Sequence, residues 1–348
     1  PRGASVRFGP MLARLLAKDP ARRPAGAKEV ADVLELGERS DFWRRMSEQA
    51  PRLAARARLE ALRRPTPTVF VGRTAERAIL DRALESARRA GPHAIEVVGP
   101  PGTGRRRLCD ARIGHWLVTQ DRLEFLGATA DTSIGATPEA PLPALLIDWL
   151  CPGERQGRAL PRTRLEVRCA EELGSVFDES ERRRLVTALA EDGDTDPRAE
   201  DLTDLFSRAL LGSAASRGTT VVRIDRSEHL GRVARDVIRR TLSGLEGHPL
   251  LWVLVGDRPF TEQPFEGETL RVEGLDHDDF VAFGSLLFED PSLTRSRLEP
   301  LLKDAWRSFS GQPRALIESL EDLVTDGFLQ GNLGSLHSLD SEVRRLDP

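Results

Sequence analysis

A glycine-rich turn holds the residues of this sequence that are best suited to bind phosphate. The turn reads Gly-Pro-Pro-Gly-Thr-Gly-Arg-Arg over residues 99–106, with the spacing of the phosphate-binding motif G-x-x-x-x-G-K-S/T. In that motif backbone N–H groups surround the phosphates, the lysine contacts them, and the final hydroxyl binds Mg²⁺. Arg105 and Arg106 stand in place of the lysine and the hydroxyl. The candidate phosphate-binding residues are Gly99, Pro100, Pro101, Gly102, Thr103, Gly104, Arg105 and Arg106.

The two arginines change what this turn can bind. A lysine is a compact point charge, whereas Arg105 is a bulkier planar fork. The guanidinium of Arg106 has no acceptor atom and carries a positive charge, so it cannot bind a metal ion and should repel one. We therefore expect weak binding of ATP or ADP at this turn, in an environment that disfavours Mg²⁺.

Predicted strands and helices place the turn at the end of a strand. Short apolar runs predict five strands, and helical periodicity predicts a helix ahead of them over residues 75–90 and helices between them over 202–213 and 233–245. Strands that alternate with helices are typical of an α/β fold with a parallel sheet covered on both faces. The predicted strands are Ala94–Val98, Leu123–Ala128, Thr219–Asp225, Leu250–Gly256 and Thr269–Val272.

The chain after Asp276 has a different pattern, helical throughout. Leu316, Leu320 and Leu323 lie on one stripe of a predicted helix, and Gly327 is placed to end it. We expect a small helical lid subdomain in this part of the chain.

Several short motifs, in order along the chain, resemble those of the STAND class of AAA-like P-loop signalling ATPases. Phe70-Val71-Gly72-Arg73 resembles the first motif of that class, and the segment 137–142 resembles the one that follows its second strand. Residues 251–256, followed by Arg258, resemble the sensor strand and its arginine, and Gly311-Gln312-Pro313 matches a G-x-P signature whose proline lies near the adenine. The resemblance implies a P-loop NTPase fold, and it adds to the nucleotide site Val71, Gly72, Arg73, Arg258 and Pro313.

The resemblance also places Asp225 at the end of the Walker B strand, where it could orient Mg²⁺. Asp225 is our only candidate metal ligand. The class has an acid at the next position to activate water, but here that residue is Arg226, which cannot act as a base near neutral pH. Asp225 and Glu228 are therefore the catalytic candidates. Because side chains alternate along a strand, Arg223 shares a face with Asp225, and a local ion pair would neutralise the metal ligand.

The beginning of the chain suggests a second resemblance. Residues 15–24 read L-L-A-K-D-P-A-R-R-P and, with residues 27–34, resemble the last helices of a protein kinase C-lobe; an ordinary helical hairpin is the alternative. The resemblance implies that Arg23 is the family's buried arginine, with its glutamate partner upstream of Pro1. The sequence has no glycine-rich ATP loop, H-R-D or D-F-G of its own. We therefore expect an internal segment of a longer bacterial-type signalling protein with a Ser/Thr kinase.

These patterns divide the chain into four parts. We expect kinase-tail helices over residues 1–37, an Arg-rich helical linker over 38–68, a P-loop NTPase core over 69–275 and the helical lid over 276–348.

Composition restricts the possible partners. The formal net charge of -4 gives no general attraction to nucleic acid or to a membrane surface, and no apolar run approaches the roughly 18 residues of a membrane span. The three cysteines show no paired spacing, which favours reduced thiols and a cytoplasmic location. We expect protein partners instead, namely a kinase upstream and sensor or repeat domains downstream in the same polypeptide.

The sequence therefore predicts a regulatory or scaffolding ATPase-fold module in signal transduction, with a degenerate nucleotide site and little or no ATP hydrolysis. The alternative is a working ATP switch, in which Arg105 contacts the phosphates and an unrecognised residue is the base.

Overall fold

The computed structural model describes most of the chain from Phe70 onward. The described residues are 70–120, 122–130, 141–151, 160–190, 199–244, 248–260, 267–288, 295–326, 329–330 and 337–338, with isolated positions at 15, 23, 24, 26, 30, 31 and 33. The chain divides into two compact units, residues 1–54 and 55–348, and the fold below is that of the second.

Most of the segment that resembles a kinase tail, and all of the predicted linker over 38–68, lie outside the described residues. Arg23 is one of the isolated described positions, and it is exposed. The resemblance expects a glutamate upstream of Pro1 to bury it, so the burial of Arg23 beside that partner stays a prediction.

A five-stranded parallel sheet forms the centre of the second unit. Its strand order is β2-β3-β4-β1-β5, and every neighbouring pair is parallel. The strands are β1 (His93–Val98), β2 (Leu123–Thr129), β3 (Thr219–Asp225), β4 (Leu250–Gly256) and β5 (Glu268–Arg271). All residues of β3 and β4 are buried, as expected for strands covered on both faces. The predicted α/β fold is confirmed.

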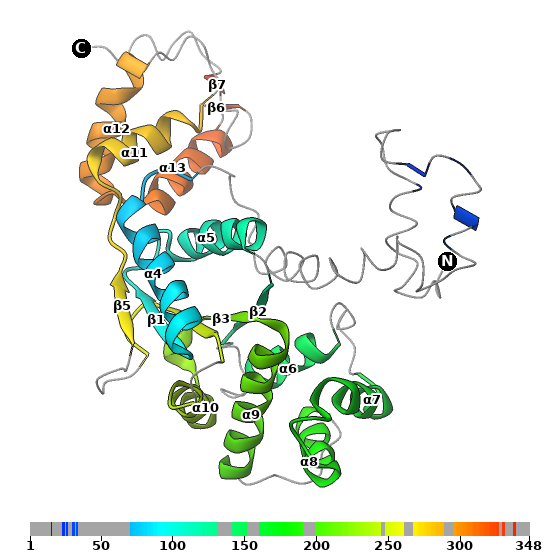
Figure 1. Ribbon diagram of the computed structural model, residues 1–348. Coiled ribbons are helices and arrows are strands. Elements are labelled where there is room, and N and C mark those ends of the chain that lie inside the picture. The colour runs from blue at the N-terminus through cyan, green and yellow to red at the C-terminus, as the bar shows by residue number, and fades with distance from the viewer. Residues whose placement is uncertain are drawn as a thin grey trace. The chain divides into compact units, whose positions relative to one another are not determined.

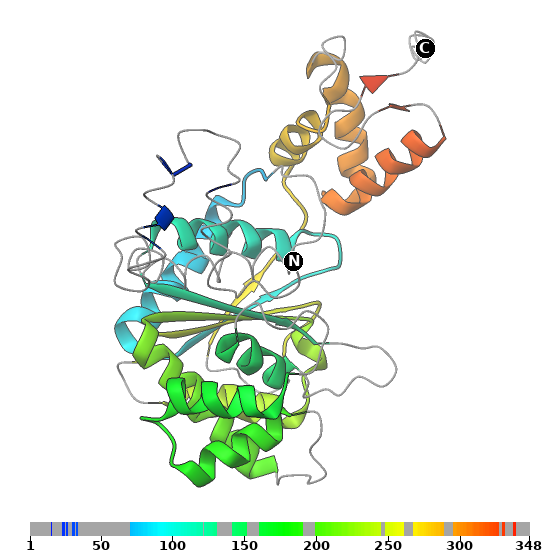
Figure 2. The ribbon, with the colours of Figure 1, turned by 90° about the vertical axis from the view of Figure 1, so that its right-hand side faces the viewer.

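Two layers of helices cover the sheet (Figure 2). Helices α4 (Thr74–Ala90) and α5 (Arg105–Thr119) pack on one face, in a core that includes Val221. Helices α6 (Pro141–Leu150), α9 (Ala199–Arg217) and α10 (Arg232–Leu242) pack on the other face, in a core that includes Val222 and Ile224. Since side chains alternate along β3, Arg223 and Asp225 project from the same face as Val221, toward α5.

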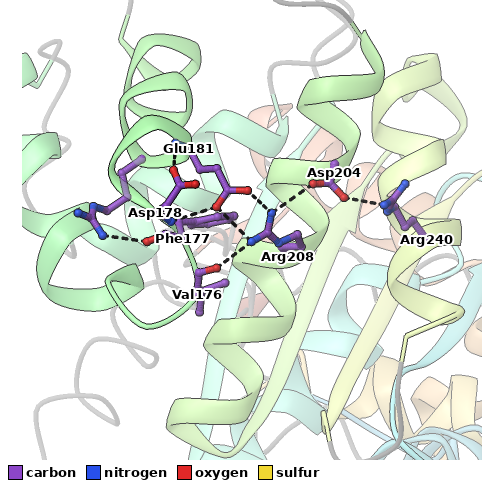
Figure 3. Close-up of polar contacts among 8 residues, drawn as sticks. Val176, Phe177, Asp178, Glu181, Asp204, Arg208 and Arg240 are labelled. Atoms are coloured by element: carbon purple, nitrogen blue, oxygen red, sulfur yellow. Dashed lines mark hydrogen bonds and ion pairs between the residues drawn. The ribbon is translucent and has the colours of Figure 1, made fainter.

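Helices α7 (Arg162–Leu173) and α8 (Glu179–Leu189) extend the second layer, and the sequence did not predict them. Asp178 and Glu181 form a capping box at the start of α8. Arg208 of α9 ties α8 in place, because it donates to Glu181 Oε1 at 2.6 Å and to the Val176 carbonyl at 2.8 Å (Figure 3). Its guanidinium also lies 4.7 Å from the centre of the Phe177 ring.

The C-terminal subdomain contains α11 (His277–Ser285), α12 (Arg295–Phe309) and α13 (Pro313–Thr325), which share a third core and lie together in Figure 1. The sequence pattern predicts that this subdomain is helical throughout, and this prediction is wrong. Two-residue strands β6 (Leu329–Gln330) and β7 (His337–Ser338) pair antiparallel. Strands this short leave no alternating pattern in the sequence. The predicted helix end at Gly327 lies outside the described residues.

No helix in the described ranges has both the length and the apolar composition needed to cross a bilayer.

Candidate functional site

The glycine-rich turn connects β1 to α5 at the carboxyl end of the sheet. The chain leaves β1 for β2 at one edge of the sheet, while β5 lies on the opposite side of β1. Ligands of open parallel sheets bind at such a point, where the strand order reverses. Gly104 begins α5 with φ 92°, a conformation that favours glycine, and a Cβ there would meet nothing within 4 Å. There is therefore free space beside Gly104, next to the start of α5, where backbone N–H groups can bind phosphate.

A cleft of about 540 Å³ runs along this turn, a volume within the usual range of about 300–1,000 Å³ for small-molecule sites. One part of the cleft is apolar and the other is rich in arginine. The apolar lining is Phe70, Val71, Leu275, Phe283, Pro313 and Ile317. The polar lining includes Thr103, Arg73, Arg105, Arg106, Arg107, Arg226, Arg314, Asp110, Asp257, Glu318 and Glu321. The arrangement suits a ligand with a flat apolar ring and an anionic chain.

Arg73 fastens the turn to the segment that follows β5. Its Nη2 atom donates to the Thr103 carbonyl at 3.1 Å and to the Glu273 carbonyl at 2.5 Å, while Nη1 contacts Glu76 at 2.7 Å. Its neighbour Gly72 has φ 64°, and a Cβ there would overlap the carboxylate of Asp279 in α11. These two residues therefore position the turn and α11, and Gly72 does not line the cleft.

The start of α13 approaches the turn from the lid. The backbone N–H of Arg314 donates to the Gly102 carbonyl at 3.3 Å. Pro313, which begins α13, lines the cleft together with Ile317 one turn later. The lid thus supplies part of the apolar wall.

Arg105, at the position of the motif's lysine, is bound to the end of β4. Its two terminal nitrogens donate to the Gly256 carbonyl and to the carboxylate of Asp257. Only 11% of its side chain is exposed. A phosphate group in the cleft would have to compete with Asp257 for this guanidinium.

Asp225 is held by two arginines. Its Oδ2 atom lies 3.3 Å from Nη2 of Arg223 and 3.5 Å from Nε of Arg106. The predicted ion pair between Arg223 and Asp225 is thereby confirmed. Arg223 is fully buried and also donates to the carboxylate of Asp110 in α5. Asp110, Arg106, Arg223 and Asp225 thus form a charge-balanced cluster of two carboxylates and two guanidiniums.

Burial and pairing act in opposite directions on the acid–base behaviour of this cluster. Burial raises the pKa of the Asp225 carboxyl, and the nearby guanidiniums of Arg223 and Arg106 oppose that rise. Burial alone would lower the pKa of Arg223, but the carboxylates of Asp225 and Asp110 outweigh it, and the pKa is raised. Arg223 therefore carries its positive charge at neutral pH.

The predicted site residues do not all meet in the cleft. Val71, Arg73, Pro101–Arg106 and Pro313 line it, whereas Gly99, Pro100, Gly72, Asp225 and Glu228 are not among the lining residues. A Cβ on Gly99 would lie 2.1 Å from the Val272 carbonyl, so this glycine permits close backbone packing. Arg258 is exposed just past β4 and also lies outside the lining, while its neighbour Asp257 lies within it.

Two acidic oxygens near the end of β3 stand out. Within the described part of the chain, the Oδ1 atom of Asp225 and the Oε2 atom of Glu228 are buried and have no hydrogen-bond partner. Glu228 lies in the short helix η4 (Ser227–His229), and a Cβ on Gly256 would be 2.5 Å from its Oε2 atom. Glu228 is therefore beside the end of β4 and not in the cleft.

Sequence reasoning missed most of the apolar wall and several polar lining residues. Phe283 and Ile317 read as ordinary core positions of helical segments and Leu275 as an apolar residue ahead of them, so no local signal marked them. Arg314 and Asp257 could have been found, because each adjoins a residue that the resemblance had singled out.

Residues 69–253, more than half of the chain, match the AAA ATPase domain family, and the chain belongs to that family. Membership implies nucleotide binding in general. No curated protein matches the sequence.

Solved structures with a similar fold are distant in sequence. The chain is similar to the Drosophila ORC bound to DNA (14% identity, TM-score 0.45, 79% of this chain and 62% of that one). It is also similar to the Aeropyrum pernix ORC1 protein in complex with DNA (15% identity, TM-score 0.46, 78% of this chain and 64% of that one). It is similar as well to a STAND protein with a tetratricopeptide repeat sensor from Pyrococcus horikoshii (12% identity, TM-score 0.38, 72% of this chain and 29% of that one). The chain spans less than two thirds of each of these chains.

Proposed function

We propose that this chain is a regulatory or scaffolding AAA-fold module of a signalling protein, with a nucleotide site that does not hydrolyse ATP. The observation that carries the proposal is the pairing of Asp225 with Arg223 and Arg106, at 3.3 and 3.5 Å. The carboxylate at the metal position is thereby neutralised by side chains.

The residues around Asp225 do not fit a magnesium ion. Mg²⁺ requires near-octahedral oxygen ligands at about 2.0–2.1 Å. Arg106 replaces the hydroxyl that would be one ligand, and the Oδ2 atom of Asp225 is shared by two guanidiniums. A divalent cation here would lie beside two buried or half-buried positive charges, so the ionic repulsion opposes its binding.

The second requirement for hydrolysis is a base near the attacking water. Arg226 occupies the position after Asp225, has φ 58° and lines the cleft. A guanidinium cannot accept a proton at neutral pH. Losing a general base typically lowers a rate by about 10²–10⁴.

One observation favours the alternative, a working ATP switch. The Oε2 atom of Glu228 is buried without a hydrogen-bond partner among the described residues, and one reason for such an unpaired polar atom is a catalytic role. Under this alternative a rearrangement of η4 would bring Glu228 into the cleft and make it the base.

The cellular setting follows from the sequence resemblances alone. We propose a Ser/Thr kinase upstream in the same polypeptide, sensor or repeat domains downstream, and a cytoplasmic location.

The experiment is phosphate release from Mg-ATP by the purified chain, with Glu228→Gln as the companion variant. We expect no release above the protein-free background. Steady turnover that Glu228→Gln abolishes would replace the proposal with the ATP switch. Steady turnover that survives Glu228→Gln would also overturn it and would point to another base.

A further inference from the structure

We infer that the cleft binds a nucleoside polyphosphate without its metal ion, with arginine side chains in place of Mg²⁺, so that Mg²⁺ weakens binding. The inference rests on the proposed function, because it concerns the same site. Beyond that function, the ligand is the metal-free nucleotide, and Mg²⁺ lowers its affinity for the cleft.

The charge of the cleft favours the metal-free ligand. Six arginines and four acidic residues line it, which leaves an excess of two positive charges. A metal-free triphosphate carries more negative charge than its magnesium complex. Coulomb attraction to a positively charged cleft is therefore stronger for the metal-free form.

Arg106 is placed to serve both Asp225 and a phosphate. It lies in the first turn of α5, lines the cleft, and has 33% of its side chain exposed. Its guanidinium has several N–H donors, and a guanidinium often binds a phosphate group through two parallel hydrogen bonds. Arg106 can therefore contact a phosphate with one edge while it faces Asp225 with another.

Arg223 makes this shared role possible. It holds Asp225 from the buried side, so Asp225 keeps a guanidinium partner when Arg106 turns toward a ligand. Without Arg223, such a turn would leave the buried carboxylate of Asp225 without a guanidinium partner, which is unfavourable. The cluster thus supplies the positive charge that a metal ion would otherwise bring.

Adding Mg²⁺ would upset this balance. Asp110 and Asp225 already neutralise Arg106 and Arg223. A divalent ion at Asp225 would therefore add positive charge that no further carboxylate of this cluster balances. Its binding to the free ligand would also remove negative charge that the arginines attract.

Arg105 limits the affinity. Its guanidinium is already engaged by the Gly256 carbonyl and by Asp257, whose side chain is 54% exposed. The ligand's phosphates must replace the Asp257 carboxylate at Arg105. Weakening that ion pair should therefore tighten ligand binding.

The apolar wall selects a ligand with a base over a simple anion. Phe70, Leu275 and Ile317 line the cleft beside the arginine-rich part. We expect ATP and ADP to bind more tightly than inorganic triphosphate, because only the nucleotides bury a ring against this wall.

The test is calorimetric titration of the full chain with ATP, once with EDTA and once with excess Mg²⁺, at matched ionic strength. We expect ATP to bind at least about tenfold more tightly with EDTA, a difference of about 1.4 kcal/mol. Binding that requires Mg²⁺, or equal affinities, would overturn the inference. No binding in either buffer would also overturn it, and would leave the proposed absence of hydrolysis standing.

Three variants locate the effect. Arg106→Thr removes the guanidinium and restores a hydroxyl, so it should abolish the preference for the metal-free ligand. Asp257→Asn should tighten ATP binding in EDTA, since it frees Arg105. Arg232→Ala is the control, because that side chain is 91% exposed at the start of α10 and should change neither affinity. A preference for metal-free ATP that Arg106→Thr leaves unchanged would contradict the role assigned to Arg106.

Discussion

The Nε atom of Arg106 lies 3.5 Å from the Oδ2 atom of Asp225. Arg106 stands where the phosphate-binding motif has its hydroxyl, and Asp225 is the residue that the sequence resemblance places at the end of the Walker B strand. In this chain the two side chains contact each other as an ion pair. The Nη2 atom of the buried Arg223 lies 3.3 Å from the same oxygen, so the pairing of the Asp225 carboxylate does not depend on Arg106 alone.

Arg223→Met should destabilise the fold. The change keeps a long side chain but leaves the buried carboxylates of Asp110 and Asp225 without their shared cation. Breaking a buried ion pair costs about 3–5 kcal/mol, and urea denaturation at neutral pH measures the loss.

The exposed Arg232→Met is the matched control for Arg223→Met and should alter the free energy of unfolding by no more than about 0.5 kcal/mol. If both methionine variants had the same free energy of unfolding, the buried cluster would not stabilise the fold.

The double variant Arg105→Lys with Arg106→Thr should raise the affinity for Mg-ATP. It restores the point charge and the hydroxyl, and it releases the Oδ2 atom of Asp225 from one of its two guanidiniums. Hydrolysis should not return with it, because Arg226 still occupies the position of the base.

Calorimetry and phosphate release on the parent and the double variant check both statements. Brisk hydrolysis by the double variant would show that Glu228 or another acid can act as the base.

Arg258→Ala should leave nucleotide affinity unchanged within error. The resemblance placed this residue at the nucleotide, but it is exposed and outside the lining of the cleft. A loss of tenfold or more, about 1.4 kcal/mol, would show that the arginine reaches the ligand in the bound state.

The contact of Arg208 with Glu181 should make the stability of α8 depend on pH. The hydrogen bond from Arg208 is the main reason that the pKa of Glu181 is lowered, and the backbone N–H of Asp178 adds to it. A carboxyl with a lowered pKa stabilises the folded state above its unfolded pKa of about 4.3, and this stabilisation is lost as pH falls through the folded value. Arg208→Ala should therefore cost about 1 kcal/mol at pH 7, given partial screening by solvent, and less below about pH 4.

Urea denaturation across that pH range tests the dependence on Arg208. Arg183→Ala is the control, because its pair with Glu179 lies on the same helix with both side chains more than two thirds exposed. An Arg208→Ala cost that stays constant from pH 7 to about pH 3 would mean that Glu181 is not the partner that matters.

Local patterns were enough to predict the sheet. The bounds of β3 and β4 agree with the predicted strands to the residue, because buried parallel strands leave uninterrupted apolar runs. The pair of Arg223 with Asp225 also followed from alternation along one strand. Helices α7 and α8, in contrast, were not predicted, although the spacing of Asp178 and Glu181 is that of a capping box and could have indicated the start of α8.

The remaining features of the site depend on contacts between distant segments. Phe70 and Phe283 line one cleft although 212 other residues separate them in the sequence. Asp110 joins the cluster only because α5 packs on the face of β3 that carries Arg223. No spacing rule within a single element could have predicted either relationship.

The most direct test of the account is to locate a metal ion in the site. Crystals of the chain grown with ATP and Mn²⁺, a heavier substitute for Mg²⁺, would reveal the metal by its anomalous scattering. We predict no manganese peak within about 2.5 Å of the Asp225 carboxylate, with Arg106 and Arg223 still in contact with it. A manganese ion bound to Asp225, with Arg106 displaced, would contradict the central claim.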